Sequence, residues 1–295
     1  MLERPTLGFV GLGKVGMTLS RLLIARGYVI RSVYSRSVSR AQVLASEIRA
    51  NVATSAEGVA TSADLTFLTV LDDELGEVAA TFNQAELGGK AIVHTSGVHE
   101  ASVLEMLVGR GAMIGSLHPI YPFADVEQSI RELPGAAFGV QTESPILLRW
   151  LKELVSALDG QTLIIGAGQK ALYHSALVFA SNYGVTLYAI AQRLLAHVGA
   201  ESEVSSLALN TLIASMVRNL QVMGTPKALT GPLVRGDVGT IEAHLAALQQ
   251  FNPILANLYT QLAMETLPLA IARGVDTGLI EALLRRKMDD AANHT

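Results

Sequence analysis

A glycine-rich segment at residues 11–16 follows a strand-like run at residues 6–10 and opens a helical pattern. Its spacing, G-x-G-x-x-G, at a strand-to-helix turn is typical of dinucleotide-binding proteins. The first glycine permits the tight turn, the second lets a pyrophosphate approach the backbone, and the third lets helix and strand pack closely. The helix N-terminus favours the phosphates; the alternative is a glycine turn that binds no ligand. We therefore predict cofactor contacts from Gly11, Leu12, Gly13, Lys14, Val15 and Gly16.

The N-terminal half alternates short apolar runs with helical patterns, which indicates a mostly parallel, doubly wound sheet. This is the α/β architecture of a Rossmann domain. The expected strands are residues 6–10, 29–34, 65–70, 91–95, 112–117, 136–140 and 161–165. The expected helices between them are residues 14–26, 38–49, 74–82, 100–108 and 145–158.

After Gly166 the pattern is entirely helical, with expected helices at residues 169–198, 203–222, 240–250, 253–273 and 277–288. In the loop between the second and third of these helices, Thr240 is expected to cap the helix that follows. We therefore predict two domains, an NAD(P)-binding Rossmann domain at residues 1–166 and an all-α domain at residues 167–295. The second domain is expected to supply the substrate pocket and a dimer interface.

Composition excludes several classes of function. The net charge of -4 gives no reason to expect nucleic acid or an anionic membrane as a partner. The chain has no cysteine, so disulfides, thiolate nucleophiles and cysteine-ligated metals are excluded, and we predict no metal site. Hydrophobic residues make up 50% and charged residues 16%, which hints at apolar surface buried between subunits. Residues 1–6 are unlike a signal peptide and the apolar stretch 171–196 is interrupted by polar residues, so we expect a cytoplasmic protein with no membrane span.

The second expected strand ends at Ser35, Arg36 and Ser37, where dinucleotide-binding chains contact the adenosine ribose. Chains that bind NAD place an acidic residue here, and an acid would repel the 2′-phosphate of NADP. This chain offers two hydroxyl groups and a guanidinium, which can bind a phosphate bidentately. We therefore predict NADP (NADPH) as the cofactor. The alternative is that Ser37 only caps the next helix while Arg36 is solvated.

Two further strands end in polar residues at the edge where open α/β sheets bind their ligands. Thr69 and Val70 close one strand, Ser96 follows another, and all three are expected beside the cofactor. His94 precedes Ser96, and we interpret it as a packed strand residue.

Two clusters are candidates for the chemistry. His118 follows an expected strand in the stiff segment His118–Pro119, and a histidine can donate a proton or a hydrogen bond near neutral pH.

The second cluster lies on one face of the first C-terminal helix, where Lys170, His174 and Ser181 fall within about 40° of one another. Asn182 borders that face. Polar groups on an apolar helix are costly to bury without partners, so they suit a pocket. We predict His118, Lys170 and His174 as catalytic residues, with Ser181 and Asn182 in contact with the substrate. The alternatives are a structural histidine and a set of hydrogen bonds between domains.

The glycine-rich stretch at residues 229–240 interrupts two apolar helices. Three uses of its Arg235 and Asp237 are open from the sequence. The two residues pair with each other, or they clamp a carboxylate substrate, or they bond across a dimer. We predict both residues as substrate-binding, with Arg235 as an anion clamp.

Several motifs carry a resemblance to a known family: GFVGLGKVG, HTSG, LHPIYPFAD, KALYHSALVFASNY and TGPLVRGD. Over nearly its full length the chain resembles Rossmann-like proteins whose C-terminal half is a domain of unknown function numbered 2520. That family is similar to the wider group with a helical domain of the 6-phosphogluconate-dehydrogenase C-terminal type. The group includes pyrroline-5-carboxylate reductase, ketopantoate reductase and prephenate dehydrogenase. The resemblance implies an NADP-binding domain and a helical domain that forms a homodimer.

The leading hypothesis is an NADP-dependent oxidoreductase that reduces a C=O or C=N group of a small, anionic molecule. The alternative is a non-catalytic NADP-binding sensor that changes its affinity for a partner protein with the cofactor. Fold alone does not decide between them.

Overall fold

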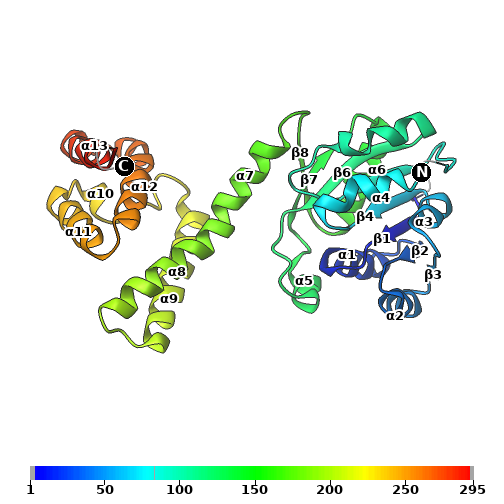
Figure 1. The fold of residues 1–295 in the computed structure, drawn as a ribbon, viewed down its shortest axis with the longest axis horizontal. Helices are drawn as coiled ribbons and strands as arrows, with labels where there is room; N and C mark the ends of the chain where they lie inside the picture. The colour runs from blue at the N-terminus through cyan, green and yellow to red at the C-terminus, as the bar shows by residue number, and fades with distance from the viewer. Residues whose placement is uncertain (1–3, 83, 293–295) are drawn as a thin grey trace. The chain divides into compact units, whose positions relative to one another are not determined.

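The computed structural model describes residues 4–82 and 84–292. The chain divides into two compact units, Met1–Thr186 and Leu187–Thr295. The first is an α/β unit built on one sheet, and the second is helical (Figure 1). Each unit is described by itself below.

One eight-stranded sheet organises the first unit, with strand order β3-β2-β1-β4-β5-β6-β7-β8. All neighbouring strands are parallel except β6 and β7, which pair antiparallel. The chain order reverses between β1 and β4, which is where open α/β sheets place their ligands. The strands are β1 (Leu7–Val10), β2 (Ile30–Tyr34), β3 (Asn51–Val52), β4 (Leu65–Leu68), β5 (Ala91–His94), β6 (Met113–Pro119), β7 (Ala137–Gln141) and β8 (Gln161–Ile164).

Two hydrophobic cores cover the two faces of this sheet, because alternate residues of a strand point to opposite faces. Phe67 and Val93 belong to the core under α1, α2 and α6, whereas Leu68 and Ile92 belong to the core under α3, α4 and η2. The helical elements of this unit are α1 (Lys14–Ala25), α2 (Val38–Ile48), α3 (Ala56–Ser62), η1 (Asp72–Glu74), α4 (Leu75–Ala80), η2 (Ala101–Arg110), α5 (Val126–Glu132), α6 (Pro145–Ala157) and α7 (Lys170–Ala180).

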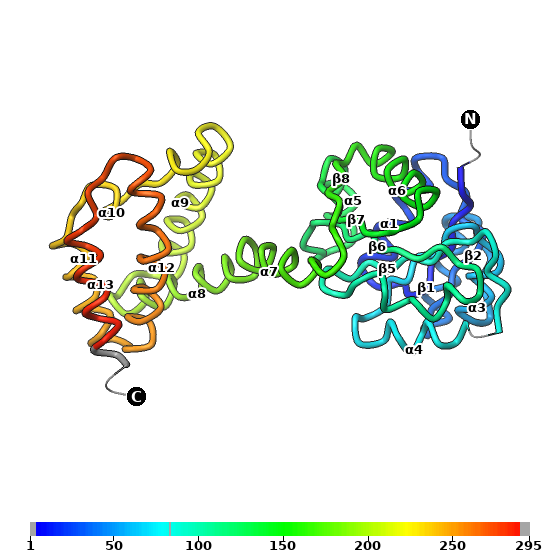
Figure 2. The backbone as a smooth tube through the Cα atoms, turned by 90° about the horizontal axis from the view of Figure 1, so that it is seen from above, coloured from blue at the N-terminus to red at the C-terminus, as the bar shows by residue number. Residues whose placement is uncertain are grey.

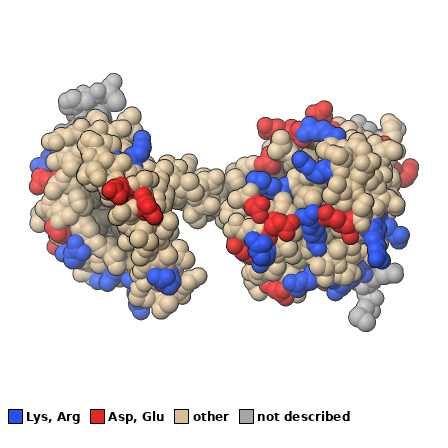
Figure 3. Space-filling view, turned by 90° about the horizontal axis from the view of Figure 1, so that it is seen from below, with Lys and Arg blue, Asp and Glu red and all other residues tan. Residues whose placement is uncertain are grey.

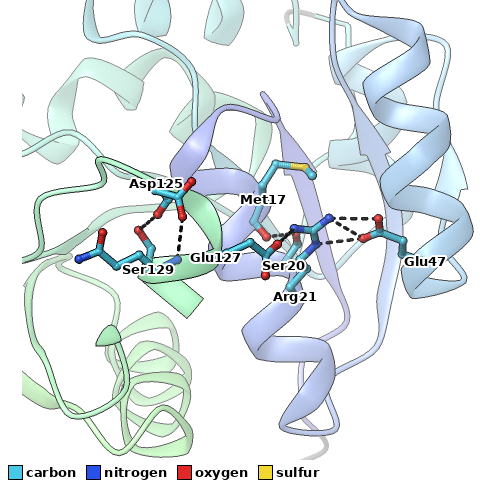
Figure 4. A network of polar contacts seen from close by, with 8 residues as sticks. Met17, Ser20, Arg21, Glu47, Asp125, Glu127 and Ser129 are labelled. Carbon is cyan, nitrogen blue, oxygen red and sulfur yellow. Dashed lines mark hydrogen bonds and ion pairs between the residues drawn. The ribbon is translucent and has the colours of Figure 1, made fainter. Parts of the chain in front are cut away.

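An arginine on α1 connects three helices on the first of these faces. Arg21 forms ion pairs with Glu47 of α2 at 2.8 Å and with Glu127 of α5 at 3.1 Å. Asp125 caps α5 by accepting a hydrogen bond from the backbone N–H of Gln128. Figure 4 shows Glu47 and Glu127 meeting at Arg21 of α1, while Asp125 bonds within its own helix. These contacts link α1 to α2 and to α5.

The second unit has its own core where α11, α12 and α13 lie side by side (Figures 1 and 2). Ile241, Leu267 and Leu284 are among its buried members. Asn252 caps α12, which has Pro253 at its first turn, where proline is tolerated because no N–H is needed there. The helices are α8 (Asn182–His197), which starts in the first unit, α9 (Ser202–Met223), α10 (Pro232–Arg235), α11 (Val238–Phe251), α12 (Pro253–Ile271) and α13 (Gly278–Ala292).

The predicted fold class, an α/β Rossmann-like domain followed by a helical region, is confirmed. Several details of the prediction were wrong. The pattern missed the short elements β3, α3, α5 and α10, and residues 101–110 form a 3-10 helix. The expected single helix at residues 169–198 breaks at Ser181, so α7 and α8 are separate helices. Asp237, not Thr240, caps α11, since its carboxylate accepts from the backbone N–H of Thr240.

Among the described residues, no helix combines the length and the apolar character needed to cross a bilayer.

Candidate active site

The first cavity, about 540 Å³, opens at the carboxyl ends of β1, β2 and β4. Its volume falls within the range of small-ligand sites. Predicted cofactor residues from three separate segments meet here, although they are distant in sequence. The cavity is lined by Val10, Gly11, Leu12, Gly13, Tyr34, Ser35, Arg36, Arg40, Ser55, Ala56, Glu57, Thr69, Val70, Leu71, Glu74, Glu77, Val78 and Thr81.

The three glycines of the turn differ in what they make possible. Gly11 has φ +92°, and a Cβ there would lie 2.8 Å from the backbone of Thr69. A Cβ at Gly16 would lie 2.5 Å from Oγ1 of the same threonine, so this glycine lets α1 pack on the end of β4. At Gly13 a Cβ would meet nothing within 4 Å, so open space faces this backbone. A ligand can therefore approach the backbone at Gly13, while Gly11 and Gly16 are required by the protein itself.

Arg36 projects into the mouth of this cavity, with 78% of its side chain exposed. Its guanidinium forms an ion pair with Glu74 of η1 at 2.8 Å. Ser35 also lines the cavity, whereas Ser37 lies outside the lining and caps α2, accepting from the backbone N–H of Arg40. Lys14 and Gly16 likewise lie outside the lining of both cavities.

A second cavity of about 480 Å³ adjoins the first, because Thr69, Val70 and Leu71 line both. It is lined by Val15, Thr69, Val70, Leu71, Asp72, Asp73, Thr95, Ser96, Gly97, His118 and His174. It thus combines predicted cofactor residues with two of the predicted catalytic residues. Of the described residues that line it, the carboxylates Asp72 and Asp73 carry the formal charge.

Lys170, the first residue of α7, has a fully buried side chain beneath this second cavity. Its Nζ donates to the backbone oxygen of Ser96 at 2.7 Å and lies 3.2 Å from Oγ of Ser116. Burial lowers the pKa of Lys170 from 10.5 to about 8, and the carboxylates of Glu100 and Asp72 oppose that shift. Lys170 itself does not line the cavity, but its ammonium is bonded to Ser96, which does.

His118 lies one residue before the end of β6, and its ring reaches the second cavity. Its Nδ1 lies 2.7 Å from the hydroxyl of Tyr173. Burial lowers the pKa of His118 to about 4, with further lowering by the charges of Lys170 and His174. The ring is therefore neutral at neutral pH.

His174 faces the same cavity from α7, and its ring centroid lies 6.1 Å from that of His118. Gly97 is the reason both rings fit: a Cβ there would lie 3.0 Å from Nε2 of each histidine and would collide with Cδ2 of His174. The two imidazoles consequently meet over a glycine at the end of β5.

His94 is fully buried at the end of β5, which confirms its interpretation as a packed strand residue. Its Nδ1 accepts from the backbone N–H of Ser96, and its Nε2 lies 3.2 Å from the backbone oxygen of Glu100. Burial lowers the pKa of His94 to about 3, with a further contribution from Lys170. This neutral ring holds the shape of the loop that carries Ser96 and Gly97.

The remaining predicted site residues lie elsewhere. Ser181 and Asn182 are exposed at the break between α7 and α8 and do not line either cavity. Arg235 and Asp237 belong to the helical unit, where Asp237 is committed to capping α11.

Sequence reasoning missed three residues that build the site: Tyr173, Glu100 and Gln141. Glu100 accepts from the backbone N–H of Lys170 at 3.0 Å, and Gln141 donates to that carboxylate at 2.5 Å. A carboxylate at a helix N-terminus is favourable, so this contact anchors the start of α7. Tyr173 had a usable signal, since it follows Lys170 by three residues and such residues are neighbours on a helix.

Each half of the chain matches the model of a known protein family. Residues 2–119 match the family model described as a Rossmann-like domain. Residues 136–266 match the model described as a domain of unknown function (DUF2520). The resemblance found in the sequence is thereby confirmed. No curated protein matches the chain in a comparison of sequences.

Solved structures share the fold over nearly the whole chain. A candidate NADP oxidoreductase from Bacteroides fragilis has a TM-score of 0.71 at 25% identity, covering 91% of this chain and 99% of that one. A protein from Thermotoga maritima has a TM-score of 0.75 at 24% identity, covering 92% and 100%. An imine reductase from Myxococcus stipitatus in complex with NADP+ has a TM-score of 0.63 at 17% identity, covering 90% and 94%.

The buried ammonium predicts a pH dependence of stability. Between pH 8 and 10.5 the unfolded chain keeps a proton on Lys170 that the folded chain has lost, so stability rises with pH. We expect the free energy of unfolding of wild type, relative to Lys170→Met, to increase across this window. Denaturant unfolding of both proteins at several pH values measures the difference.

Lys152→Met on α6 provides the matched control, because it removes an exposed lysine and leaves the buried ammonium in place. A difference between wild type and Lys170→Met that stays constant from pH 8 to 10.5 would show that Lys170 titrates normally.

Proposed function

We propose that this chain, which joins a Rossmann-like domain to a DUF2520 domain, is an NADP-dependent oxidoreductase acting on a C=O or C=N group. The observation that carries the proposal is the pair of adjoining cavities at the switch point of the sheet. One has the size and backbone of a dinucleotide site, and the other contains two histidines. The candidate NADP oxidoreductase and the NADP+-bound imine reductase that share the fold support the same reading.

The first cavity fits a dinucleotide phosphate. The open backbone at Gly13 and the start of α1 suit a pyrophosphate, and Arg36 at the mouth suits a 2′-phosphate. Because Thr69 and Val70 line both cavities, a dinucleotide bound in the first cavity would extend past them into the second. When bound, NADPH supplies the hydride. The residues of the chain itself then have to hold and polarise the substrate.

In the second cavity we assign that task to His118 and His174, whose rings reach the lining. A neutral imidazole can donate a hydrogen bond to the oxygen or nitrogen on which negative charge develops during hydride transfer. Lys170 is assigned a positioning role, because its ammonium is buried against Ser96 and Ser116. These histidines favour an enzyme over a sensor, since a protein that only binds NADP has no need of two imidazoles in the adjoining cavity.

Other sequence predictions stay predictions. These are substrate contacts from Ser181, Asn182, Arg235 and Asp237, an anionic substrate, the domain boundary at Gly166 and a cytoplasmic location. The cavity lining itself offers two carboxylates, so an anionic substrate would need a cation from elsewhere.

We further propose that a second copy of the chain covers α9, giving the homodimer predicted for the helical half. This helix of 22 residues buries only Ser205 and Leu209. Apolar side chains along it are exposed, including Val204, Leu207, Leu212, Ile213, Met216 and Val217. Such a surface marks an interface, and a self-complementary patch is the usual basis of twofold symmetry. Residues 171–192, which belong to α7 and α8, contain no Lys, Arg, Asp or Glu, and the surface of α7 is correspondingly tan in Figure 3.

The cofactor assignment is tested by titrating the protein with NADPH and NADH. Arg36→Asp should weaken NADPH binding by about 10- to 100-fold and reverse the preference, because one charge-assisted contact is lost and a repulsion is added. Glu74→Gln should tighten NADPH binding by roughly twofold to fivefold, since it removes a competing carboxylate.

Arg31→Asp is the matched control, because Arg31 is exposed on β2, the strand that precedes Arg36, and lies outside the cavity. If wild type takes up neither nucleotide, the proposed function is wrong.

The catalytic assignment is tested by following NADPH oxidation with a panel of small ketones, keto acids and cyclic imines. His118→Ala should lower turnover by about 100- to 1000-fold, because a positioned donor is lost, and should leave NADPH affinity unchanged. His244→Ala in the helical unit serves as the histidine control. Equal losses of affinity and turnover would instead place His118 in the cofactor site.

The dimer is tested by sedimentation equilibrium. Wild type should have twice the chain mass, and Leu212→Asp should have the mass of one chain, because the dimer would bury an unpaired charge. Leu279→Asp is the control, since Leu279 is 76% exposed on α13. A wild-type protein that sediments as a single chain at all concentrations rules out this interface.

A further inference from the structure

Three elements of the α/β unit meet at the ring of His118. His118 on β6 pairs directly with Gly139 on the antiparallel strand β7. Tyr173 of α7 fills the space over that glycine: a Cβ at Gly139 would collide with the tyrosine hydroxyl and lie 2.8 Å from its Cζ. The missing side chain on β7 therefore creates the place from which Tyr173 reaches Nδ1 of His118, 2.7 Å away.

Either His118 Nδ1 or the Tyr173 hydroxyl can be the donor in this hydrogen bond, and the two arrangements leave different groups without a partner. If Nδ1–H donates, the phenolic O–H is left without a partner among the described residues, and an unmade hydrogen bond in a partly buried site is costly. If the tyrosine donates, its O–H is satisfied and the ring proton resides on Nε2. Nε2 is the atom that faces Gly97 and the second cavity, where a ligand can accept from it.

We propose that Tyr173 is a positioning residue: its hydroxyl donates to Nδ1 of His118 and so keeps an Nε2–H directed into the cavity beside Gly97. The proposal rests on the proposed function in one respect only, namely that the atom met by Nε2–H is the substrate oxygen or nitrogen. The state of the ring itself is a property of the free protein.

The surroundings of the pair support this arrangement. The titratable groups near His118 are Lys170 and His174 of α7 and His94 of β5, and the carboxylates Asp72 and Asp73 line the same cavity. Burial raises the pKa of Tyr173 to about 12, so the hydroxyl keeps its proton at neutral pH. Nζ of Lys170 lies 5.6 Å from the centroid of the tyrosine ring, and the ring centroid of His118 lies 5.7 Å from it.

The chemical consequence is a fixed neutral donor. A histidine that carries its proton on Nε2 stabilises negative charge by a hydrogen bond without itself changing charge. Without Tyr173 the two neutral forms would exchange, and only part of the protein would present a donor. Tyr173 would therefore raise kcat without touching the substrate.

The test measures the protonation of the two ring nitrogens directly. Wild-type protein labelled with nitrogen-15 in its histidines is examined without cofactor by long-range proton–nitrogen correlation, with His118→Gln used to assign the signals. We expect the Nε2–H form in wild type. In Tyr173→Phe we expect loss of the single form, with Nδ1–H signals appearing. Turnover of that variant should fall by about 10-fold or more, with NADPH affinity unchanged.

Tyr259→Phe is the matched control, because Tyr259 makes the same kind of contact with Nδ1 of His244 at 3.1 Å in the helical unit. It should leave the His118 signals unchanged. Gly139→Ala, which displaces the hydroxyl but keeps the tyrosine, should reproduce the Tyr173→Phe spectrum.

An Nδ1–H form in the wild-type protein overturns the proposal, and so does an unchanged His118 spectrum in folded Tyr173→Phe. If Tyr173→Phe does not fold, the wild-type spectrum alone decides. Failure of the proposed function would show differently, as absence of NADPH binding in a protein whose His118 still holds its proton on Nε2.

Discussion

The site depends on the burial of one ammonium group. Lys170 is fully buried and donates to the backbone oxygen of Ser96, while its own backbone N–H is held by Glu100. Burying this ammonium without hydrogen-bond partners would cost several kcal/mol of folding free energy. The first residue of α7 therefore has to lie where Ser96 and Glu100 accept its hydrogen bonds, at the edge of the sheet. One turn later on the same helix come Tyr173 and His174. The position of every α7 side chain in the site follows from that first contact.

Missing side chains shape the site as much as those that are present. Gly11 gives the turn its left-handed backbone, Gly97 makes room for two imidazoles, and Gly139 makes room for a tyrosine hydroxyl. Each glycine lies at the edge of the sheet where the parallel strands end or where β7 passes His118. The sheet supplies a rigid frame, and its glycines provide the space in which helices and ligands approach it.

The helical unit presents a different physical problem. Its core of α11, α12 and α13 is closed, but α9 leaves most of its apolar side chains exposed. Exposed apolar surface of this extent is unfavourable in water, which is the physical reason for proposing that a second copy of the chain covers it.

The sequence by itself determined the order of the longer strands and helices, the glycine turn and the change to an all-helical half, because hydrophobic period and glycine spacing are local properties. It missed the short elements β3, α3, α5 and α10, whose patterns span too few residues. It also named His118, Lys170 and His174 as candidates. Only the tertiary structure decided which of these residues face a cavity. It buried the Lys170 ammonium, broke the helix at Ser181, and brought Tyr173 onto His118 across 55 residues of sequence. Such contacts depend on strand pairing and on the absence of a Cβ at Gly139. No local pattern encodes them, since they exist only once distant segments have packed together.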